Sequence, residues 1–297
     1  MFHVKISIPM SKIITIINQK GGTGKTTTTV NLSAALADQG KRMLVIDADP
    51  QGNATSGLGV NKNELDVSVY DVLLNKATAQ EAILDGVYPN IDMIPCNINL
   101  TGAEIELVGA LSRETRLKKA LDPIKENYDF IFIDSPPSLG LLTLNALVSS
   151  DSIIIPIQCE FYALEGVSQL LKTVNLISDG LNTKLSIQGV LLTMADFRTN
   201  LTTEVINEIK SYFKEKVYKT IIPRNIRLSE APSHGKPITV YDANSIGAIR
   251  YNELAKEFLG IGIDHKSLDE NRLDKLINKD QKSGSQEEAL ENTENLD

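Results

Sequence analysis

A run of nine residues near the N-terminus has the composition of a phosphate-binding loop. The run is Gln19-Lys20-Gly21-Gly22-Thr23-Gly24-Lys25-Thr26-Thr27. A β-branched segment, 13–17, precedes it, and a helix-like segment, 26–39, follows it. Glycines let backbone N–H groups turn toward an anion, and the following helix adds its positive dipole end. In such a unit Lys25 reaches the β- and γ-phosphates of a nucleotide, and the Thr26 hydroxyl ligates Mg²⁺.

The loop departs from the usual G-x-x-x-x-G-K-[ST] pattern, because Gln19 replaces the first glycine and Lys20 adds a second lysine. Lys25 is sufficient for the phosphates of its own site. We therefore interpret Lys20 as a cation that reaches a phosphate held by a second subunit. The alternative is a solvated loop lysine without that role.

Three carboxylates follow two other strand-like segments. Asp47 and Asp49 end the run 43–49, and at this spacing two strand residues project to the same side. Asp134 ends the apolar run 130–133, which is the Walker B form whose carboxylate holds Mg²⁺, often through water. Three acids at two strand ends beside a glycine loop predict a nucleotide site with Mg²⁺ and an oriented water.

The length and composition suit one large α/β domain or two small ones, with 297 residues, 42% hydrophobic and 23% charged. No apolar run approaches the roughly 20 residues that span a bilayer, and the N-terminus does not read as a signal peptide. Cys96 and Cys159 are far apart in sequence. They predict reduced thiols rather than a disulfide or a metal framework, which favours a cytoplasmic protein.

Charge is unevenly placed along the chain, whose net charge is −8. Residues 263–297 carry an excess of acids, whereas residues 205–256 carry an excess of bases. The composition therefore predicts a local basic region within an acidic protein.

Apolar runs alternate with helical patterns, which predicts a mainly parallel, twisted sheet with helices on both faces, the three-layer P-loop NTPase fold. The expected strands are 13–18, 43–48, 91–95, 130–134, 152–157, 187–193 and 217–222. The expected helices are 26–39, 69–74, 79–84, 112–126, 139–148, 164–178, 202–213 and 245–258. We expect a domain over 11–262, an N-terminal extension over 1–10 with Met10 as an alternative start, and a disordered acidic tail over 263–297.

Four segments together, 20–27, 47–53, 134–137 and 223–237, resemble one known family. The chain is similar to the ParA-type chromosome and plasmid partition ATPases, which have a deviant Walker A loop and belong to the MinD/ParA superfamily. Within them it resembles the short Soj subgroup. The resemblance covers about 11–261, and no helix-turn-helix extension precedes the loop, so we do not expect operator repression.

The resemblance implies roles for individual residues. Lys20 corresponds to the lysine that crosses the dimer interface, Asp49 to the residue that positions the hydrolytic water, and Asp47 to an outer Mg²⁺ partner. The expected catalytic residues are Lys20, Lys25 and Asp49. The expected nucleotide-binding residues are Lys20, Gly21, Gly22, Thr23, Gly24, Lys25, Thr26, Thr27, Pro223 and Asn225, the last two beside the adenine. The expected Mg²⁺ site consists of Thr26, Asp47 and Asp134, with the aspartates acting through water.

The resemblance also implies partners. An ATP-bound homodimer would bind double-stranded DNA non-specifically, and a ParB-like centromere-binding protein would stimulate hydrolysis and release it. This predicts a nucleoid-associated protein. The expected DNA contacts are Arg198, Arg224, Arg227, Lys236 and Arg250. Lys210, Lys214, Lys216 and Lys219 are further candidates, although the first three are equally consistent with ordinary helix-surface charges.

Two alternatives keep the same fold class. A MinD-like membrane-associated ATPase would need a basic amphipathic helix at its C-terminus, whereas residues 263–297 are acidic. The second alternative is a metabolic or electron-transfer relative, such as dethiobiotin synthetase or the nitrogenase iron protein. The iron protein needs cysteine ligands, and Cys96 and Cys159 lack a suitable spacing.

Overall fold

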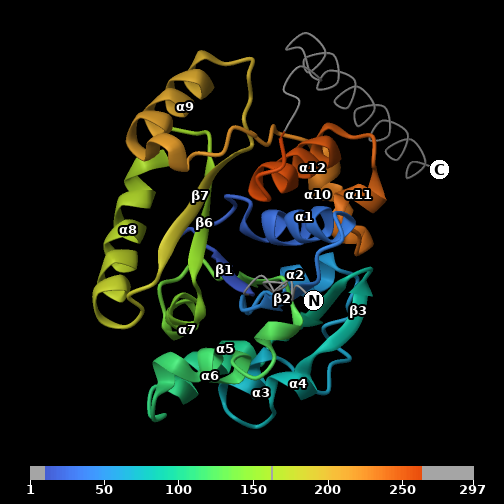
Figure 1. Ribbon diagram of the computed structural model, residues 1–297, viewed down its shortest axis with the longest axis vertical. Coiled ribbons are helices and arrows are strands. Elements are labelled where there is room, and N and C mark those ends of the chain that lie inside the picture. Colours follow the sequence, from blue (N-terminus) through green and yellow to red (C-terminus); the bar gives the residue numbers. More distant parts are fainter. Residues whose placement is uncertain (1–10, 162, 263–297) are drawn as a thin grey trace, which may run out of the picture.

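One seven-stranded sheet organises the computed structural model, which describes residues 11–161 and 163–262. The strands are β1 (Lys12–Ile16), β2 (Met43–Asp47), β3 (Leu84–Tyr88), β4 (Ile91–Ile94), β5 (Phe130–Asp134), β6 (Ser152–Gln158) and β7 (Ser186–Thr193). Their order across the sheet is β3-β4-β2-β5-β1-β6-β7 (Figure 1). Every neighbouring pair is parallel except β3 and β4, which pair antiparallel at one edge.

Helices connect these strands. In the first half they are α1 (Lys25–Asp38), α2 (Asn53–Gly57), α3 (Val69–Leu73), α4 (Ala79–Ala82), α5 (Leu100–Leu107), η1 (Arg113–Thr115), α6 (Arg116–Leu121) and η2 (Lys125–Asn127). In the second half they are α7 (Leu141–Ser149), α8 (Ala163–Gly180), α9 (Asn200–Phe213), η3 (Lys214–Lys216), α10 (Ile226–Glu230), η4 (Ala231–His234), α11 (Ile238–Tyr241) and α12 (Ile246–Phe258).

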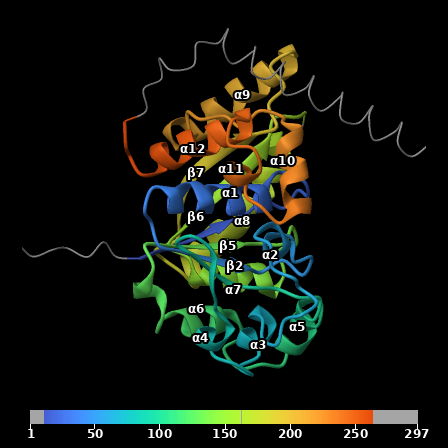
Figure 2. The same ribbon diagram turned by 90° about the vertical axis from the view of Figure 1, so that its right-hand side faces the viewer.

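Helices cover both faces of the sheet, as Figure 2 shows with α1 and α10–α12 on one side and α3–α7 on the other. Side chains alternate between the faces along each strand, so Ile14 and Ile16 of β1 pack with α1 and α12, whereas Ile13 packs with the α3–α7 side. A third core cluster joins β6 and β7 to α8 and α9. The predicted fold class, a three-layer parallel α/β sheet, is confirmed.

The expected strand over 217–222 is wrong. Its contacts with β7 and the residues after it are two isolated bridges, Val190 with Val217 and Ala195 with Pro223, and a hydrogen bond from the N–H of Ile222 to the carbonyl of Leu192. Between them, the N–H groups of Lys219 and Thr220 donate to the carboxylate of Glu257 on α12 rather than to β7. A side chain from a distant helix therefore takes donors that a strand would need.

Other differences concern short elements. The expected helix over 112–126 is broken, since α6 ends at Leu121 two residues before Pro123, and Ser112 has a φ of 53°. Strand β3 and helices α2, α5, α10 and α11 were not expected. The predicted segments 1–10 and 263–297 lie outside the described residues, and the assignment of 11–262 as one ATPase domain stays a proposal.

Candidate nucleotide-binding site

The glycine loop connects β1 to α1 in a conformation that only glycine adopts readily. Gly22 and Gly24 have φ values of 73° and 89°, and Gly24 is the residue that caps the N-terminus of α1. The carbonyl of Thr23 accepts a hydrogen bond of 2.9 Å from Thr193 at the end of β7. The loop is therefore tied to the sheet, and the first turn of α1 is available for an anion.

Lys25 is held inside this loop. Its side chain crosses the loop, and Nζ donates to the carbonyl of Lys20 at 3.4 Å. Burial lowers the pKa of the Lys25 ammonium, while the nearby Asp134 and Asp49 act in the opposite direction. A cation held this way, with little competing water, interacts strongly with phosphate oxygens.

The two aspartates at the ends of β2 and β5 lie side by side, because Asp47 and Asp134 are register partners in the sheet. Asp134 accepts hydrogen bonds from Thr26 Oγ1 at 2.7 Å and from Thr29 Oγ1 at 3.1 Å. Asp47 accepts from both the N–H and the hydroxyl of Thr55, each at 2.7 Å. Helices α1 and α2 thus orient one carboxylate each.

Both buried carboxylates have a raised pKa. For Asp134 burial is the largest cause and repulsion from Asp47 the second. For Asp47 burial again raises the pKa, and the hydrogen bonds from Thr55 partly offset it. Within the described residues, no group of three or more His, Cys, Asp or Glu side chains could hold a metal ion directly. A hydroxyl and two adjacent carboxylates fit Mg²⁺ held mainly through water and phosphate oxygens.

Asp49 follows β2 by two residues and stands at the start of the loop to α2. Its Oδ1 accepts a hydrogen bond of 3.0 Å from the N–H of Gln51, and the residue is 8% exposed. Its backbone N–H donates to Asp47 at 3.2 Å. Asp49 is therefore oriented by its own loop, close to Lys25 and the end of β2.

A cavity of about 510 Å³ opens beside the glycine loop. Gly24, Thr26 and Thr27 line it on the phosphate side, and Pro223 and Asn225 line it on the other. Asn225 caps α10 by accepting a hydrogen bond of 3.1 Å from the N–H of Leu228. The structure therefore brings the residues predicted near the adenine into the same cavity as the phosphate loop, although their contacts with a base are not tested.

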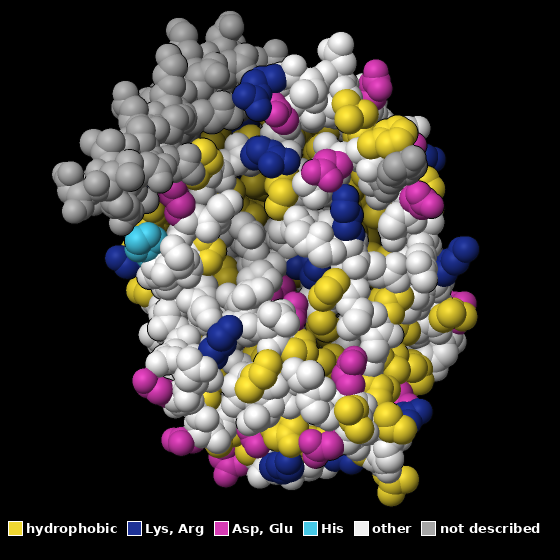
Figure 3. Space-filling view, turned by 180° about the vertical axis from the view of Figure 1, so that it is seen from behind, with side chains coloured by type: hydrophobic (Ala, Val, Ile, Leu, Met, Phe, Trp, Pro, Cys, Tyr) yellow, Lys and Arg dark blue, Asp and Glu magenta, His cyan; other side chains and the backbone are white. Residues whose placement is uncertain are grey.

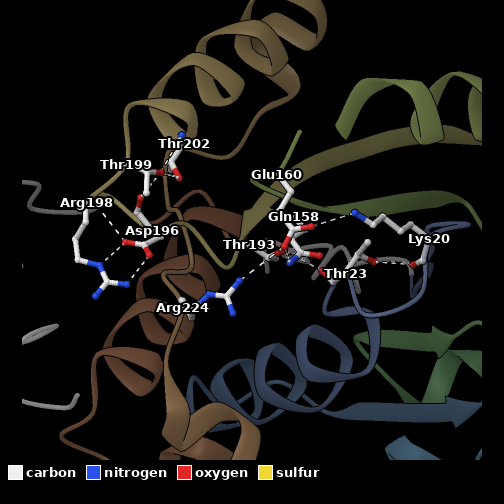
Figure 4. Close-up of polar contacts among 10 residues, drawn as sticks. All are labelled: Lys20, Thr23, Gln158, Glu160, Thr193, Asp196, Arg198, Thr199, Thr202 and Arg224. Atoms are coloured by element: carbon white, nitrogen blue, oxygen red, sulfur yellow. Dashed lines mark hydrogen bonds and ion pairs between the residues drawn. The ribbon is translucent and has the colours of Figure 1, made fainter. Parts of the chain in front are cut away.

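Lys20 does not line this cavity, and its side chain extends toward the segment just after β6. Figure 4 shows its Nζ donating to Glu160 Oε2, at 3.2 Å. Arg224 approaches the other oxygen of Glu160 at 3.8 Å, and Gln158 Nε2 also donates to that oxygen. Glu160 was not among the predicted site residues, and its only sequence signal is its position just after a buried strand.

The predicted DNA contacts fall into two classes. Arg198, Arg224 and Lys236 are exposed, although Asp196 holds Arg198 through two short hydrogen bonds (Figure 4). The side chains of Arg227 and Arg250 are only 16% and 17% exposed and pair with acids three residues further along their helices. Figure 3 shows that basic and acidic side chains are interspersed on the face it presents, without one large basic patch.

The family-model comparison matches an AAA domain over residues 11–187. The chain is 62% identical over 253 residues to the sporulation initiation inhibitor protein Soj of Bacillus subtilis, which covers 85% of this chain and all of the relative. The chain belongs to the ParA/Soj family of chromosome-partitioning ATPases. This confirms the predicted family.

Other comparisons agree with this ParA/Soj membership. The chain is 50% identical to the chromosome partitioning protein ParA of Myxococcus xanthus, over 84% of this chain and 88% of the relative. A solved structure described as cobyrinic acid a,c-diamide synthase from Mycobacterium smegmatis, with bound ADP and magnesium, has a TM-score of 0.73 and 37% identity. That match covers 84% of this chain and 94% of the other. No helix in the described part of this ParA/Soj chain combines the length and the apolar character of a membrane span.

Sequence reasoning missed several residues that shape the site. Thr29 and Thr55 orient Asp134 and Asp47, and both could have been suspected from their place in the first turns after the two motifs. The contact between Gly59 and Gly235 had no such signal. A Cβ on Gly59 would lie 2.9 Å from the carbonyl oxygen of Gly235, so these two loops meet through their backbones.

Proposed function

We propose that this protein is a Mg²⁺-dependent partition ATPase whose ATP-bound dimer binds DNA and whose hydrolysis releases it. The observation that carries the proposal is the convergence of Lys25, Asp49 and Asp134 at the ends of three neighbouring strands, beside a second lysine in the loop. The identity to Soj and ParA relatives supports the same function.

Nucleotide binding uses the loop and the cavity beside it. The backbone N–H groups of Gly21 to Thr27 and the Lys25 ammonium bind the phosphates, and the wall with Pro223 and Asn225 accommodates the adenine. Thr26, Asp134 and Asp47 are the residues that hold Mg²⁺, the aspartates through water. When bound, this ion neutralises charge on the phosphate oxygens.

Hydrolysis requires alignment and charge stabilisation more than covalent chemistry. Asp49 is held by its own loop, so its second carboxylate oxygen can accept a hydrogen bond from an attacking water. Lys25 stabilises negative charge that develops on the transferred phosphoryl group. The slow chemistry expected of a single subunit reflects the absence of Lys20 from its own phosphate site.

We base the proposed dimer on Lys20. Its ammonium donates to Glu160, whereas the ammonium of Lys25 donates to the loop itself. A lysine in this position is suited to the γ-phosphate of a second subunit. ATP then favours the dimer, since this contact is made only when both the γ-phosphate and the partner are present.

DNA binding would depend on that dimer. We propose the exposed cations Arg198, Arg224 and Lys236 as phosphate contacts, because the side chains of Arg227 and Arg250 are largely buried against their acidic partners. Few contacts from one subunit give weak binding at cellular salt, and a symmetric dimer doubles them. DNA binding in the ATP-bound state would associate the protein with the nucleoid. A ParB-like partner that stimulates hydrolysis would release the protein from DNA.

Sedimentation of the wild type, Lys20→Ala and Asp49→Ala with ADP, ATP or no nucleotide, with and without duplex DNA, tests the proposal. We expect the wild type to dimerise and to bind DNA only with ATP. Lys20→Ala should bind ATP with near-normal affinity and stay monomeric. Asp49→Ala should accumulate as an ATP-bound dimer on DNA, with turnover reduced at least tenfold.

Parallel pelleting with liposomes separates this function from a MinD-like one. Binding to anionic vesicles with ATP, without binding to DNA, would favour the membrane-associated alternative. A wild type that stays monomeric with ATP and binds DNA equally well would overturn the partition mechanism.

A further inference from the structure

Glu160 lies where the phosphate loop, the end of β6 and the adenine-side loop meet. Its two oxygens face different cations, since Oε2 accepts from Lys20 at 3.2 Å and Oε1 lies 3.8 Å from the guanidinium of Arg224 (Figure 4). Lys20 and Glu160 are 140 residues apart in the chain. The pair therefore exists only because the fold places β1 and β6 side by side.

The backbones of both partners are fixed to the same strand end. The N–H of Lys20 donates to the side chain of Asn18 at 3.0 Å, and Asn18 in turn donates to the carbonyl of Pro156 in β6 at 2.7 Å. Beyond β6, the N–H of Cys159 donates to the carbonyl of Thr193 at 3.0 Å. Only the side chains of Lys20 and Glu160 therefore need to move for the ion pair to open.

We propose that Glu160 is a positioning residue that holds Lys20 within its own subunit, and that this contact must open before Lys20 reaches the nucleotide of a partner. The inference rests on the proposed function, because it assigns a competing contact to the lysine that we place in the dimer interface. Glu160 thereby sets how readily ATP produces the dimer.

The contact between Lys20 and Glu160 is suited to adjusting the dimerisation equilibrium rather than to blocking dimerisation. The side chains of Lys20 and Glu160 are 49% and 44% exposed, and an ion pair of such exposure changes an equilibrium by only about two- to fivefold. Arg224 lies 3.8 Å from the other oxygen of Glu160, so the carboxylate has a second cationic neighbour besides Lys20. Salt weakens the pair, because exposed charges are screened.

The first test compares Glu160→Gln with Glu165→Gln, which removes the same charge from an exposed position in α8 that forms no ion pair with a described residue. Analytical ultracentrifugation with a non-hydrolysable ATP analogue and Mg²⁺ measures the protein concentration at half dimerisation. We expect a value about two- to fivefold lower for Glu160→Gln than for the wild type, and an unchanged value for Glu165→Gln. The difference should shrink at high salt.

The second test examines the contact in the nucleotide-free monomer. Reductive ¹³C-dimethylation keeps the lysine charge, and the Lys20 resonance is identified from its absence in Lys20→Gln. We expect Glu160→Gln to shift this resonance and Glu165→Gln to leave it unchanged. If the chemical shift of Lys20 is the same in Glu160→Gln as in the wild type, the contact between Lys20 and Glu160 does not exist in solution.

The outcomes separate the inference from the proposed function. If the wild type dimerises and Glu160→Gln dimerises equally or less readily, the inference alone is overturned. Weaker dimerisation of Glu160→Gln would make Glu160 part of the dimer contact. A wild type that stays monomeric with the ATP analogue removes the proposed function, and with it the role of Glu160.

Discussion

At the scale of single residues, the site contains negative charge that the protein alone does not neutralise. Asp134 and Asp47 are both fully buried and stand next to each other in the sheet. Burial and mutual repulsion raise the pKa of Asp134 to about 8. Such an arrangement destabilises the nucleotide-free fold and favours a bound cation, which is common where function requires strained groups.

Asp134→Asn should therefore stabilise the nucleotide-free protein. A raised pKa means that folding costs free energy at any pH above the pKa of the unfolded chain, because folded Asp134 must either take up a proton or stay ionised in an unfavourable site. The amide removes that cost. We expect a gain on the order of 1–2 kcal/mol near pH 8, measured by urea unfolding. The gain should fall as the pH is lowered from 8 toward 4, because folded Asp134 is already protonated below its raised pKa and the unfolded chain then gains less and less from ionising the same carboxyl.

The same variant should lose most of the stabilisation that Mg²⁺-ATP confers on the wild type, as followed by thermal unfolding. A control variant must change a charge without breaking other contacts. Asn145→Asp is unsuitable as this control, because the Asn145 side chain accepts a hydrogen bond from Leu117 and donates one to Arg113. Asp38→Asn is a suitable one, since Asp38 is exposed at the far end of α1, where an amide oxygen can still accept the hydrogen bond from Tyr88. A nucleotide-free Asp134→Asn protein that is less stable than the wild type at pH 8 would contradict this account.

At the scale of elements, the segment around α2 connects the catalytic strand end to the adenine-side loop. Thr55 in α2 holds Asp47, while Gly59 just after it meets Gly235 at the end of η4. Residues of both segments line the nucleotide cavity. The two walls of the cavity therefore depend on one close backbone contact.

Gly59→Ala should widen or distort this cavity. Gly59 has a φ of 82°, and the added Cβ would lie 2.9 Å from the carbonyl oxygen of Gly235. We expect a loss of about 1–2 kcal/mol from the left-handed backbone alone, together with weaker ATP binding in titration calorimetry. Gly86→Ala is the matched control, because Gly86 has a φ of 63° and nothing within 4 Å of its Cβ position.

The control variant Gly86→Ala should lose folding stability without losing affinity for ATP. Equal ATP affinity in Gly59→Ala and Gly86→Ala would show that the contact between Gly59 and Gly235 has no influence on the cavity.

At the scale of the whole molecule, charge alone does not make this protein a DNA binder. The net charge is −8, and bases are interspersed with acids on the face in Figure 3. In the function that we propose, binding through a few phosphate contacts depends on doubling them in a dimer. The salt dependence of binding reports how many contacts each subunit supplies.

Arg198→Gln should lower the slope of log affinity against log salt by about 1.8 for the ATP-bound dimer, because one phosphate contact per subunit is lost. Lys172→Gln, an exposed lysine of α8, should leave the slope unchanged. Fluorescence anisotropy with a short duplex at several salt concentrations measures both. Identical slopes for the two variants would exclude Arg198 as a phosphate contact.

Local sequence patterns predicted the class of fold and the centre of the site. The glycine loop, the apolar runs that end in Asp47 and Asp134, and the alternation of strands with helices each depend on residues close together in the chain. Backbone conformation and strand ends follow from such neighbours, so these features could be inferred without coordinates. The edge strand β3 could not, because Leu84–Tyr88 contains Asp85 and Gly86 and lacks the continuous apolar run of the central strands.

The tertiary structure alone decided which distant groups meet. It paired Lys20 with Glu160, placed the backbone of Gly59 against Gly235, and gave the N–H groups of Lys219 and Thr220 to Glu257 instead of a strand partner. It also showed that Arg227 and Arg250 are largely buried against neighbouring acids, whereas Arg198 pairs with Asp196 but stays exposed. Such contacts depend on sheet order and helix packing. These bring together residues that are far apart in the chain, and local sequence patterns do not reveal which of them will meet.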